Sequence, residues 1–253
     1  MKISFVIPAY NESRNVGKCL KSVQAEIKRT ADSSSGGPVS AEIVVVNNAS
    51  TDKTREKALA FKGVTVVDEP LKGLVLARRA GFVVTQGELV ANIDADTVLP
   101  EGWLTTVLEE FAQNPGLVAL SGPFIYYDFN IFAQALVLVF YFFGWLFYIA
   151  NHYVLGRGGM LQGGNFVLRR AAWEAAGGYD TTITFYGEDT DVARRISKQG
   201  EVLWTWRLPM YTSGRRLRKE GIIKTGLTYA LNFFWISVIG RPYTRHYTDI
   251  RPE

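Results

Sequence analysis

The first half of the chain alternates short, continuous apolar runs with longer stretches in which apolar residues recur at helical spacing. Apolar runs without internal alternation are typical of strands that are buried on both faces of a parallel sheet. The predicted strands are residues 3–7, 42–46, 64–67 and 89–93, and the predicted helices between them are residues 13–28, about 51–61 and 74–84. The pattern therefore predicts an α/β fold with a mostly parallel sheet flanked by helices.

A polar or glycine-containing loop follows each of these strands. The four loops are residues 8–12, 47–52, 68–73 and 94–97. Sheets of this kind bind their ligands at the carboxyl ends of the strands. We therefore expect the four loops to converge on one ligand. The alternative is that each loop is only a turn.

Two carboxylates, Asp94 and Asp96, come directly after the apolar run 89–93. Side chains two residues apart on a strand point to the same face, so both can face one hard cation. Mg²⁺ or Mn²⁺ held by one or two carboxylates usually keeps its other positions for water and substrate phosphates. The pattern favours a nucleotide-diphosphate site. The alternative is that both residues only cap the turn and the helix that starts near Glu101.

Composition bounds the class of protein. With 253 residues, of which 47% are hydrophobic and 21% charged, the chain can build one large core, and we expect one domain. The single Cys19 excludes an intramolecular disulfide and a thiolate metal site. The apolar run at the N-terminus is too short for a signal peptide and resembles a first strand, which predicts a protein that is cytosolic or faces the cytosol.

The basic residues are concentrated near the C-terminus. Residues 201–253 contain nine Lys or Arg against four Asp or Glu, an excess of +5, whereas the whole chain carries +4. Such an excess favours phosphorylated ligands or anionic lipid surfaces. Because the chain has no zinc-finger spacing and no aromatic RNA-binding signature, we expect no nucleic-acid partner.

Seven motifs follow one another along the chain: VIPAYNE (6–12), VVVNNASTDKT (44–54), KGLVLARRAG (72–81), DAD (94–96), GGNF (163–166), GGYD (177–180) and GEDTDVARR (187–195). In this order they resemble the motif series of family 2 glycosyltransferases, which have the nucleotide-sugar-binding fold called GT-A. The resemblance implies a GT-A (Rossmann-like) catalytic domain over residues 1–206. Its nucleotide-binding half would be 1–97 and its acceptor and catalytic half 98–206, followed by a basic, amphipathic tail at 207–253.

The resemblance also implies which residues contact the nucleotide-sugar donor. Glu12 would bind ribose hydroxyls, Asn48 stands where the family usually has an aspartate that reads the base, and Arg78 matches an arginine near the diphosphate. The GGNF loop resembles one in which glycine lets the backbone approach donor sugar and acceptor closely. The full set of expected donor residues is Pro8, Ala9, Tyr10, Glu12, Asn48, Arg78, Asp94, Asp96, Gly164, Asn165 and Glu188.

Glu188 and Asp189 stand at the start of a predicted helix, where the helix dipole favours ionised carboxylates. An ionised carboxylate can take a proton from an acceptor hydroxyl while the nucleotide diphosphate leaves. The resemblance assigns this role to Asp189 and implies inversion at the anomeric carbon. Simple capping by these acids is the alternative. The Gln-x-x-Arg-Trp signature of processive members is missing after Trp206, so we expect transfer of one sugar per encounter.

One further metal ligand is expected from the C-terminal segment. In many enzymes of this fold, that segment closes over the bound nucleotide and supplies a histidine. His246 would then join Asp94 and Asp96 around Mg²⁺ or Mn²⁺. The alternative is a histidine on the surface or packed among aromatic rings.

Two apolar stretches predict contact with a membrane. An apolar helix at about 130–153 is long enough to span a bilayer. A single crossing would, however, separate Asp94 and Asp96 from Asp189, so we expect an interfacial or re-entrant helix, or one buried in protein. The second stretch, 222–239, mixes aromatic and polar residues and follows a cluster of arginines, which favours the headgroup boundary. A core-packing helix is the alternative.

Together these patterns predict a metal-dependent, inverting glycosyltransferase that is monotopic on the cytoplasmic face of a membrane. It would move one sugar from a nucleotide-diphosphate sugar to a lipid-phosphate or lipid-linked glycan acceptor, like the non-processive transferases with such acceptors that it resembles. Arg215, Arg216 and Arg218 would hold a lipid phosphate. The alternatives are a catalytically silent GT-A scaffold on a membrane, a soluble glycosyltransferase with a non-lipid acceptor, and a nucleotidyltransferase. An oligomer is possible.

Overall fold

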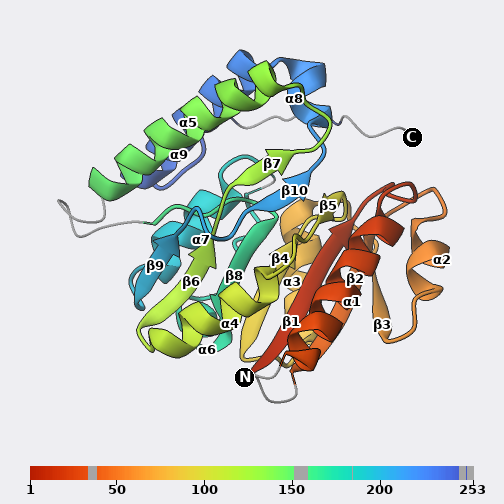
Figure 1. Cartoon of the computed structure of the whole chain (residues 1–253). Coiled ribbons are helices and arrows are strands. Elements are labelled where there is room, and N and C mark those ends of the chain that lie inside the picture. The colour runs from red at the N-terminus through yellow and green to blue at the C-terminus, as the bar shows by residue number, and fades with distance from the viewer. Residues whose placement is uncertain (34–38, 151–158, 184, 245–248, 250–253) are drawn as a thin grey trace.

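A computed structural model describes residues 1–33, 39–150, 159–183, 185–244 and 249. Its main sheet has the strand order β3-β2-β1-β4-β8-β6-β9 (Figure 1). The strands are β1 (Lys2–Ala9), β2 (Ser40–Asn48), β3 (Val64–Glu69), β4 (Leu89–Ile93), β6 (Leu117–Ser121), β8 (Asn165–Arg169) and β9 (Glu201–Trp204). All neighbours pair in parallel except β8, which is antiparallel to both β4 and β6. The predicted α/β fold with a mostly parallel sheet is confirmed.

Helices cover both faces of this sheet, as the uninterrupted apolar strands predicted. On β1, Phe5 packs into one apolar cluster and its neighbour Val6 into another, because successive side chains point to opposite faces. The first face carries α1 (Val16–Asp32) and α4 (Trp103–Gln113). The other face carries α3 (Leu74–Val84), α6 (Arg170–Ala175) and α7 (Glu188–Ile196), and α2 (Thr54–Leu59) packs near the β3 edge.

A glycine sets how closely α3 lies against the sheet. A Cβ atom on Gly81 would come within 2.4 Å of Val6 Cγ1, so any other residue would push the helix away. The close approach carries Arg78, one helical turn earlier, into the interior beside the carboxyl ends of the strands.

A second, small sheet has the order β5-β10-β7 and lies beyond the end of β4 (Figure 1). Its strands are β5 (Thr97–Val98), β7 (Phe124–Tyr126) and β10 (Met210–Thr212). The predicted domain boundary at residue 206 falls just before β10. The segment 207–253 is thus joined to the loop that carries Asp94 and Asp96 by strand pairing.

Two apolar helices form a separate layer beyond the strand ends (Figure 1). They are α5 (Ile131–Ile149) and α9 (Ile222–Ile239), and α8 (Arg215–Glu220) leads into α9. Gly226 lies against the ring of Phe140, and the rings of Phe147 and Phe233 are 5.4 Å apart, so the two helices run in parallel. Both predicted helices are confirmed, although residues 151–153 of the first lie outside the described residues.

Two tyrosine hydroxyls fasten α5 to the rest of the protein. The Tyr141 hydroxyl accepts a hydrogen bond from the Phe124 backbone N–H (3.1 Å) and donates one to Gln162 Oε1 (2.7 Å). The Tyr148 hydroxyl donates to the Val202 carbonyl oxygen (3.0 Å). Many other side chains of α5 are exposed or only half-buried. Among the described residues, α5 is the helix that is long and apolar enough to cross a membrane, by length and composition, and 17% of its most apolar window is buried.

Candidate active site

A pocket of about 530 Å³ opens between the carboxyl ends of the strands and the α5–α9 layer. All four predicted loops contribute to its wall, since Tyr10, Asn48, Lys72 and Asp94 each come from a different one. The expected site residues that line it are Pro8, Ala9, Tyr10, Asn48, Arg78, Asp94, Asp96, Glu188 and Asp189. The structure therefore brings together residues that are up to about 180 positions apart in sequence.

Three expected donor residues do not line this pocket: Glu12, Gly164 and Asn165. The Asn165 side chain is fully buried and its hydrogen bonds are used within the protein. Its amide donates to the carbonyl oxygens of Gly122 (3.0 Å) and Leu208 (2.9 Å), and its oxygen accepts from Trp103 Nε1 (3.1 Å). Asn165 therefore supports the fold beneath the pocket. Its side chain has this structural role in place of the predicted contact with the nucleotide-sugar donor.

Asp94 and Asp96 both face the pocket, but from a turn and not from a strand. Strand β4 ends at Ile93, and the Thr97 backbone N–H donates to the Asp94 carbonyl oxygen at 3.1 Å. The expectation that the two carboxylates share a face through strand alternation is wrong, because the chain has already turned. The short turn after β4, and not strand alternation, places both carboxylates on one wall of the pocket.

Arg78 joins the two ends of the site. Its guanidinium is fully buried, contacts Glu188 Oε1, and donates to Asp94 Oδ1 at 3.2 Å. A buried guanidinium needs such partners, because a lone buried charge is very costly. Arg78 therefore holds the start of α7 against the turn after β4. Arg78 lines the pocket, but guanidinium N–H groups that we expected to face a diphosphate already bind Glu188 and Asp94.

Burial changes the ionisation of the two acids at the start of α7. It raises the pKa of Glu188 to about 7, against the opposing charge of Arg78. It also raises the pKa of Asp189, although hydrogen bonds from Gly163 and Thr190 oppose the shift. We predicted that the helix dipole favours the ionised form of both carboxylates; burial shifts both pKa values the opposite way, because desolvation outweighs a dipole effect of about 1 kcal/mol.

Both carboxylate oxygens of Asp189 accept hydrogen bonds from backbone N–H groups. Oδ2 accepts from Gly163 (2.9 Å), and Oδ1 accepts from Thr190 (2.7 Å). Gly164, which follows Gly163, adopts a φ of +81°, and a Cβ atom on Gly164 would come 2.2 Å from Asp94 Cγ. The glycines of the GGNF motif thus let the backbone approach the two catalytic-site carboxylates, whereas we expected approach to the sugar.

The end of the pocket formed by β1 and β2 is shaped by amide and aromatic groups. Asn48 donates to the carbonyl oxygens of Glu69 (3.2 Å) and Leu71 (2.6 Å) and accepts from the Gly73 N–H (2.8 Å). Its side chain therefore orders the loop after β3, which presents Lys72. The Lys72 ammonium lies 4.0 Å from the centre of the Tyr10 ring and pairs with Asp249.

Arg215 reaches the pocket from α8. Its guanidinium contacts Glu12 Oε1 and lies 3.1 Å from Asp96 Oδ2. Arg216, its neighbour, lines the pocket too, and its guanidinium lies 4.5 Å from the centre of the Phe185 ring. Arg218 is half exposed, pairs with Asp128 at 2.8 Å and does not line the pocket, so the predicted arginine cluster contributes two residues there.

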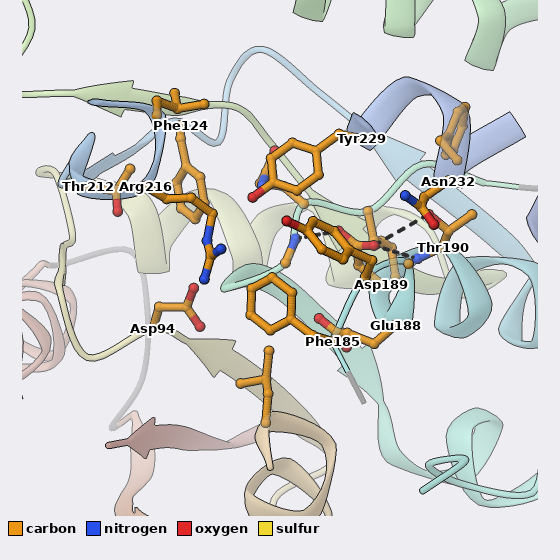
Figure 2. A pocket seen from close by; sticks show the side chains of 18 of the residues that line it. Asp94, Phe124, Phe185, Glu188, Asp189, Thr190, Thr212, Arg216, Tyr229 and Asn232 are labelled. Atoms are coloured by element: carbon orange, nitrogen blue, oxygen red, sulfur yellow. Dashed lines mark hydrogen bonds between the residues drawn. The ribbon is translucent and has the colours of Figure 1, made fainter. Parts of the chain in front are cut away.

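Aromatic side chains from α5, α9 and the segment before α7 line the outer half of the pocket. Figure 2 shows Phe185 and Tyr229 around the same cavity as Asp94, Glu188 and Asp189. Further apolar wall residues are Phe140, Tyr141, Phe143, Phe147, Tyr186 and Phe233. Sequence reasoning missed this contribution because it considered the two apolar stretches only as membrane or core elements. The lack of a polar face in the first stretch was a signal that this helix does not lie on an ordinary soluble surface.

The residues around the DxD turn fit a hard divalent cation only in part. Within the described ranges, no group of three His, Cys, Asp or Glu side chains could hold a metal by itself. Asp94 and Asp96 offer two carboxylates on one pocket wall, which suits an ion that completes its coordination with phosphates and water. The expected third ligand, His246, lies outside the described residues.

Known proteins that resemble this chain are glycosyltransferases. Glycosyltransferase AglE of Haloferax volcanii is 32% identical over 107 residues, which are 40% of this chain and 33% of AglE. Dolichyl-phosphate beta-glucosyltransferase ALG5C of Trichomonas vaginalis is 37% identical over 98 residues, 37% of this chain and 28% of that protein. The chain spans about a third or less of the length of the curated relatives it matches.

Solved structures of similar fold include the mannosyltransferase PcManGT of Pyrobaculum calidifontis in complex with GDP-Man and Mn²⁺. It has a TM-score of 0.63 and 20% identity over 88% of this chain and 62% of PcManGT. Glucosyl-3-phosphoglycerate synthase of Mycobacterium tuberculosis, in complex with Mn²⁺ and UDP-glucose, has a TM-score of 0.61 and 19% identity over 95% of this chain and 80% of that one. The predicted GT-A fold is confirmed.

The strongest match is at the level of the family. The sequence pattern described as Glycosyl transferase family 2 matches residues 4–177, which include the loop after β1, the DxD turn and the GGNF segment. These segments build the pocket described above, and the pattern covers more than half of the sequence. This chain is a member of glycosyl transferase family 2.

Proposed function

We propose that this protein transfers one sugar, with inversion, from a nucleotide-diphosphate sugar to an acceptor at a membrane, and that the acceptor is a lipid phosphate or a lipid-linked glycan. The observation that carries the proposal is the two-part pocket. Its inner wall has the carboxylates Asp94, Asp96 and Asp189, and its outer wall is built from the aromatic residues of α5 and α9. A polar donor and an apolar acceptor suit these two walls.

The donor would lie along the strand ends. Its nucleoside would contact Pro8, Ala9 and Tyr10, and the diphosphate would lie near Asp94 and Asp96. These two carboxylates would hold Mg²⁺ or Mn²⁺, which when bound would neutralise the charge that develops on the leaving diphosphate. The solved structures of PcManGT and of glucosyl-3-phosphoglycerate synthase are complexes with Mn²⁺, which supports a divalent ion here.

The reaction would be a single displacement. An oxygen of the acceptor forms a bond to the anomeric carbon while the bond from that carbon to the diphosphate oxygen breaks. If the acceptor oxygen is a hydroxyl, Asp189 takes its proton. A lipid phosphate is already anionic near neutral pH and needs a base less. In that case Arg215 and Arg216, which both line the pocket, would bind the phosphate.

The lipid acceptor is supported by the surface of the outer layer as well. Large apolar side chains of α5 and α9 are exposed, among them Phe132 (82%) and Ile223 (60%). The names of the Trichomonas vaginalis relatives state that those proteins act with dolichyl phosphate. A single crossing by α5 would place Asp94, which precedes α5, and Asp189, which follows it, on opposite sides of a membrane, whereas both line one cavity. We therefore propose a monotopic attachment.

The donor and acceptor are tested directly by an enzyme assay. Purified protein would be incubated with a panel of UDP- and GDP-sugars, with Mn²⁺ or with EDTA, and with a short polyprenyl phosphate in detergent. We expect one sugar per acceptor and release of nucleoside diphosphate only with the metal. Release of pyrophosphate would instead indicate a nucleotidyltransferase, and absence of donor binding throughout the panel would favour a silent scaffold.

Attachment to the membrane is tested by charging the exposed side of α5. The double variant Leu138→Glu with Val139→Glu changes two side chains that are 49% and 50% exposed and do not line the pocket. It should weaken binding to phosphatidylcholine–phosphatidylglycerol vesicles by roughly tenfold or more in co-sedimentation, because charges are costly in the apolar boundary. The matched control is Leu59→Glu with Val84→Glu, two side chains of α2 and α3 with 50% and 45% exposure. Equal vesicle binding by both double variants would contradict the membrane role of α5.

A further inference from the structure

A single side chain pairs with two carboxylates that come from different loops. Arg215 Nη2 contacts Glu12 Oε1 and lies 3.1 Å from Asp96 Oδ2. Glu12 follows β1 and Asp96 follows β4, whereas Arg215 comes from α8, more than 100 residues later. One positive charge thus partly neutralises Glu12, which the family resemblance assigns to the ribose, and Asp96, which our proposal assigns to the metal ion.

Both carboxylates need a cation when no ligand is bound. The Glu12 side chain is 2% exposed and that of Asp96 16% exposed, and the second oxygen of Glu12 accepts from Asn15 Nδ2 at 2.7 Å. Buried carboxylates of this kind are unfavourable unless they are paired and hydrogen-bonded. Arg215 provides the pairing within the chain itself.

Arg215 is placed so that it can leave, unlike the other arginine of the site. The Arg78 side chain is 0% exposed and is enclosed by Glu188 and Asp94, whereas Arg215 is 25% exposed and sits at the start of a short helix. Like Arg78 Nε, Arg215 Nε is buried and has no hydrogen-bond partner among the described residues, but the Arg215 side chain is partly exposed and can move. Its present position therefore leaves one donor unused, and a position with a new acceptor would satisfy it.

We propose that Arg215 occupies the cation position of the donor site in the absence of metal and nucleotide, and that it leaves Asp96 when the metal–nucleotide complex binds. The inference rests on the proposed metal role of Asp96. A divalent ion and a guanidinium on the same carboxylate repel each other, so one displaces the other. The phosphate of the proposed lipid acceptor offers the released guanidinium the bidentate acceptor that it prefers.

The exchange would couple the donor side to the acceptor side. Arg216 is the next residue, and α8 continues through Gly221 directly into α9, whose aromatic side chains line the outer half of the pocket. Movement of Arg215 therefore acts on the wall where the acceptor would bind. An ordered reaction follows, in which the donor binds before the acceptor and prepares its site.

The test is the affinity for Mn²⁺ measured by electron paramagnetic resonance in the absence of nucleotide. Arg215→Gln should bind Mn²⁺ roughly tenfold more tightly than the wild type, because a competing charge about 3 Å from the carboxylate is removed. Arg215→Lys, which keeps the charge, should stay within about twofold of the wild type. The matched control is Arg218→Gln, on the same helix but outside the pocket, and it should leave the affinity unchanged.

Two results would overturn the inference. The first is that Arg215→Gln binds Mn²⁺ without nucleotide no more tightly than the wild type does, while the wild type binds Mn²⁺ in the presence of UDP or GDP. Arg215 then does not compete with the metal ion, but the metal role of Asp96 stands. If no protein binds Mn²⁺ even with a nucleoside diphosphate, the metal assignment fails as well.

A second measurement on the wild type does not depend on how the variants fold. Hydrogen exchange of the α8 amides should become faster with Mn²⁺ plus UDP or GDP than with EDTA, since the Arg215 contacts that hold α8 are lost. Unchanged exchange in α8, with slower exchange in the loop after β4 as proof of binding, would also overturn the inference.

Discussion

Replacement of Asp96 by alanine should abolish metal-dependent binding of the nucleotide-sugar donor. Asp96 is one of two carboxylates in the DxD turn, and its wall of the pocket offers an incoming cation few other ligands. Because loss of even an indirect metal contact costs 10- to 100-fold, loss of this direct one should reduce Mn²⁺-dependent donor affinity by ~100-fold or more. Calorimetric titration of UDP- and GDP-sugars, with Mn²⁺ and with EDTA, measures the effect.

The fold should survive this substitution, because Asp96 lies in a turn at the pocket wall and not in the core. Asp32→Ala is a suitable control, since Asp32 is exposed at the end of α1 and does not line the pocket. Both variants should melt close to the wild-type temperature. The assignment of Asp96 fails if the alanine variant keeps the same difference in donor affinity between Mn²⁺ and EDTA.

Replacement of Asp189 by asparagine should remove transfer to a hydroxyl acceptor and retain donor binding. A positioned general base typically contributes 10²- to 10⁴-fold, so the loss of kcat should be in the range of ~10² to 10⁴. Asp189 lines the pocket and is the acid that the family resemblance assigns as base. Rapid-quench measurement of a single turnover, with donor affinity measured separately, distinguishes the two effects.

The asparagine is not a neutral replacement at this position. Both oxygens of Asp189 accept backbone N–H groups, from Gly163 and from Thr190, so an amide NH₂ would face one of these donors in either orientation. The cost is about 1–3 kcal/mol of stability. Asp191→Asn serves as the control, because Asp191 is buried on the same helix, pairs with Arg194 and Arg195, and does not line the pocket. Only a loss of turnover beyond that of the control reports on the base.

The outcome also reports on the acceptor. The raised pKa of Asp189 means that its ionised form is lost at a higher pH than usual as the solution is acidified. If a hydroxyl is the acceptor, wild-type turnover should fall with this ionisation, and the asparagine variant should lack that dependence. Near-normal turnover by the variant would show that the base lies elsewhere or that the acceptor oxygen is already ionised.

The sequence predicted those parts of the fold that depend on local patterns. Helix α3, helix α9 and strand β4 begin and end where the apolar spacing placed them, because glycine, proline or polar residues bound each one. The convergence of four loops followed from one rule about parallel sheets. The antiparallel insertion of β8 between β4 and β6 did not follow, since a strand's direction depends on partners far away in sequence.

Contacts between distant segments explain most of what the sequence did not predict in the site. Arg78 appeared as a ligand for a diphosphate, but its guanidinium meets Glu188, 110 residues later. The ionisation of Glu188 depends on how deeply α7 is buried, which its sequence does not encode locally. Asp94 and Asp96 were found because two acids after a buried strand need no distant information. Their pairing with arginines required the complete fold.

For the proposed membrane attachment, the tyrosine hydroxyls that fasten α5 have a consequence for how deeply the protein would sit in a bilayer. Tyr141 and Tyr148 lie seven residues apart, so they fix both the height and the tilt of the helix relative to the sheet. An enzyme attached by a flexible linker would sample many distances from the lipid surface. Under the proposed attachment, the distance from the bilayer to the reacting sugar would be set by the protein itself. The depth at which an acceptor's headgroup lies should therefore select substrates as strongly as its chemical identity.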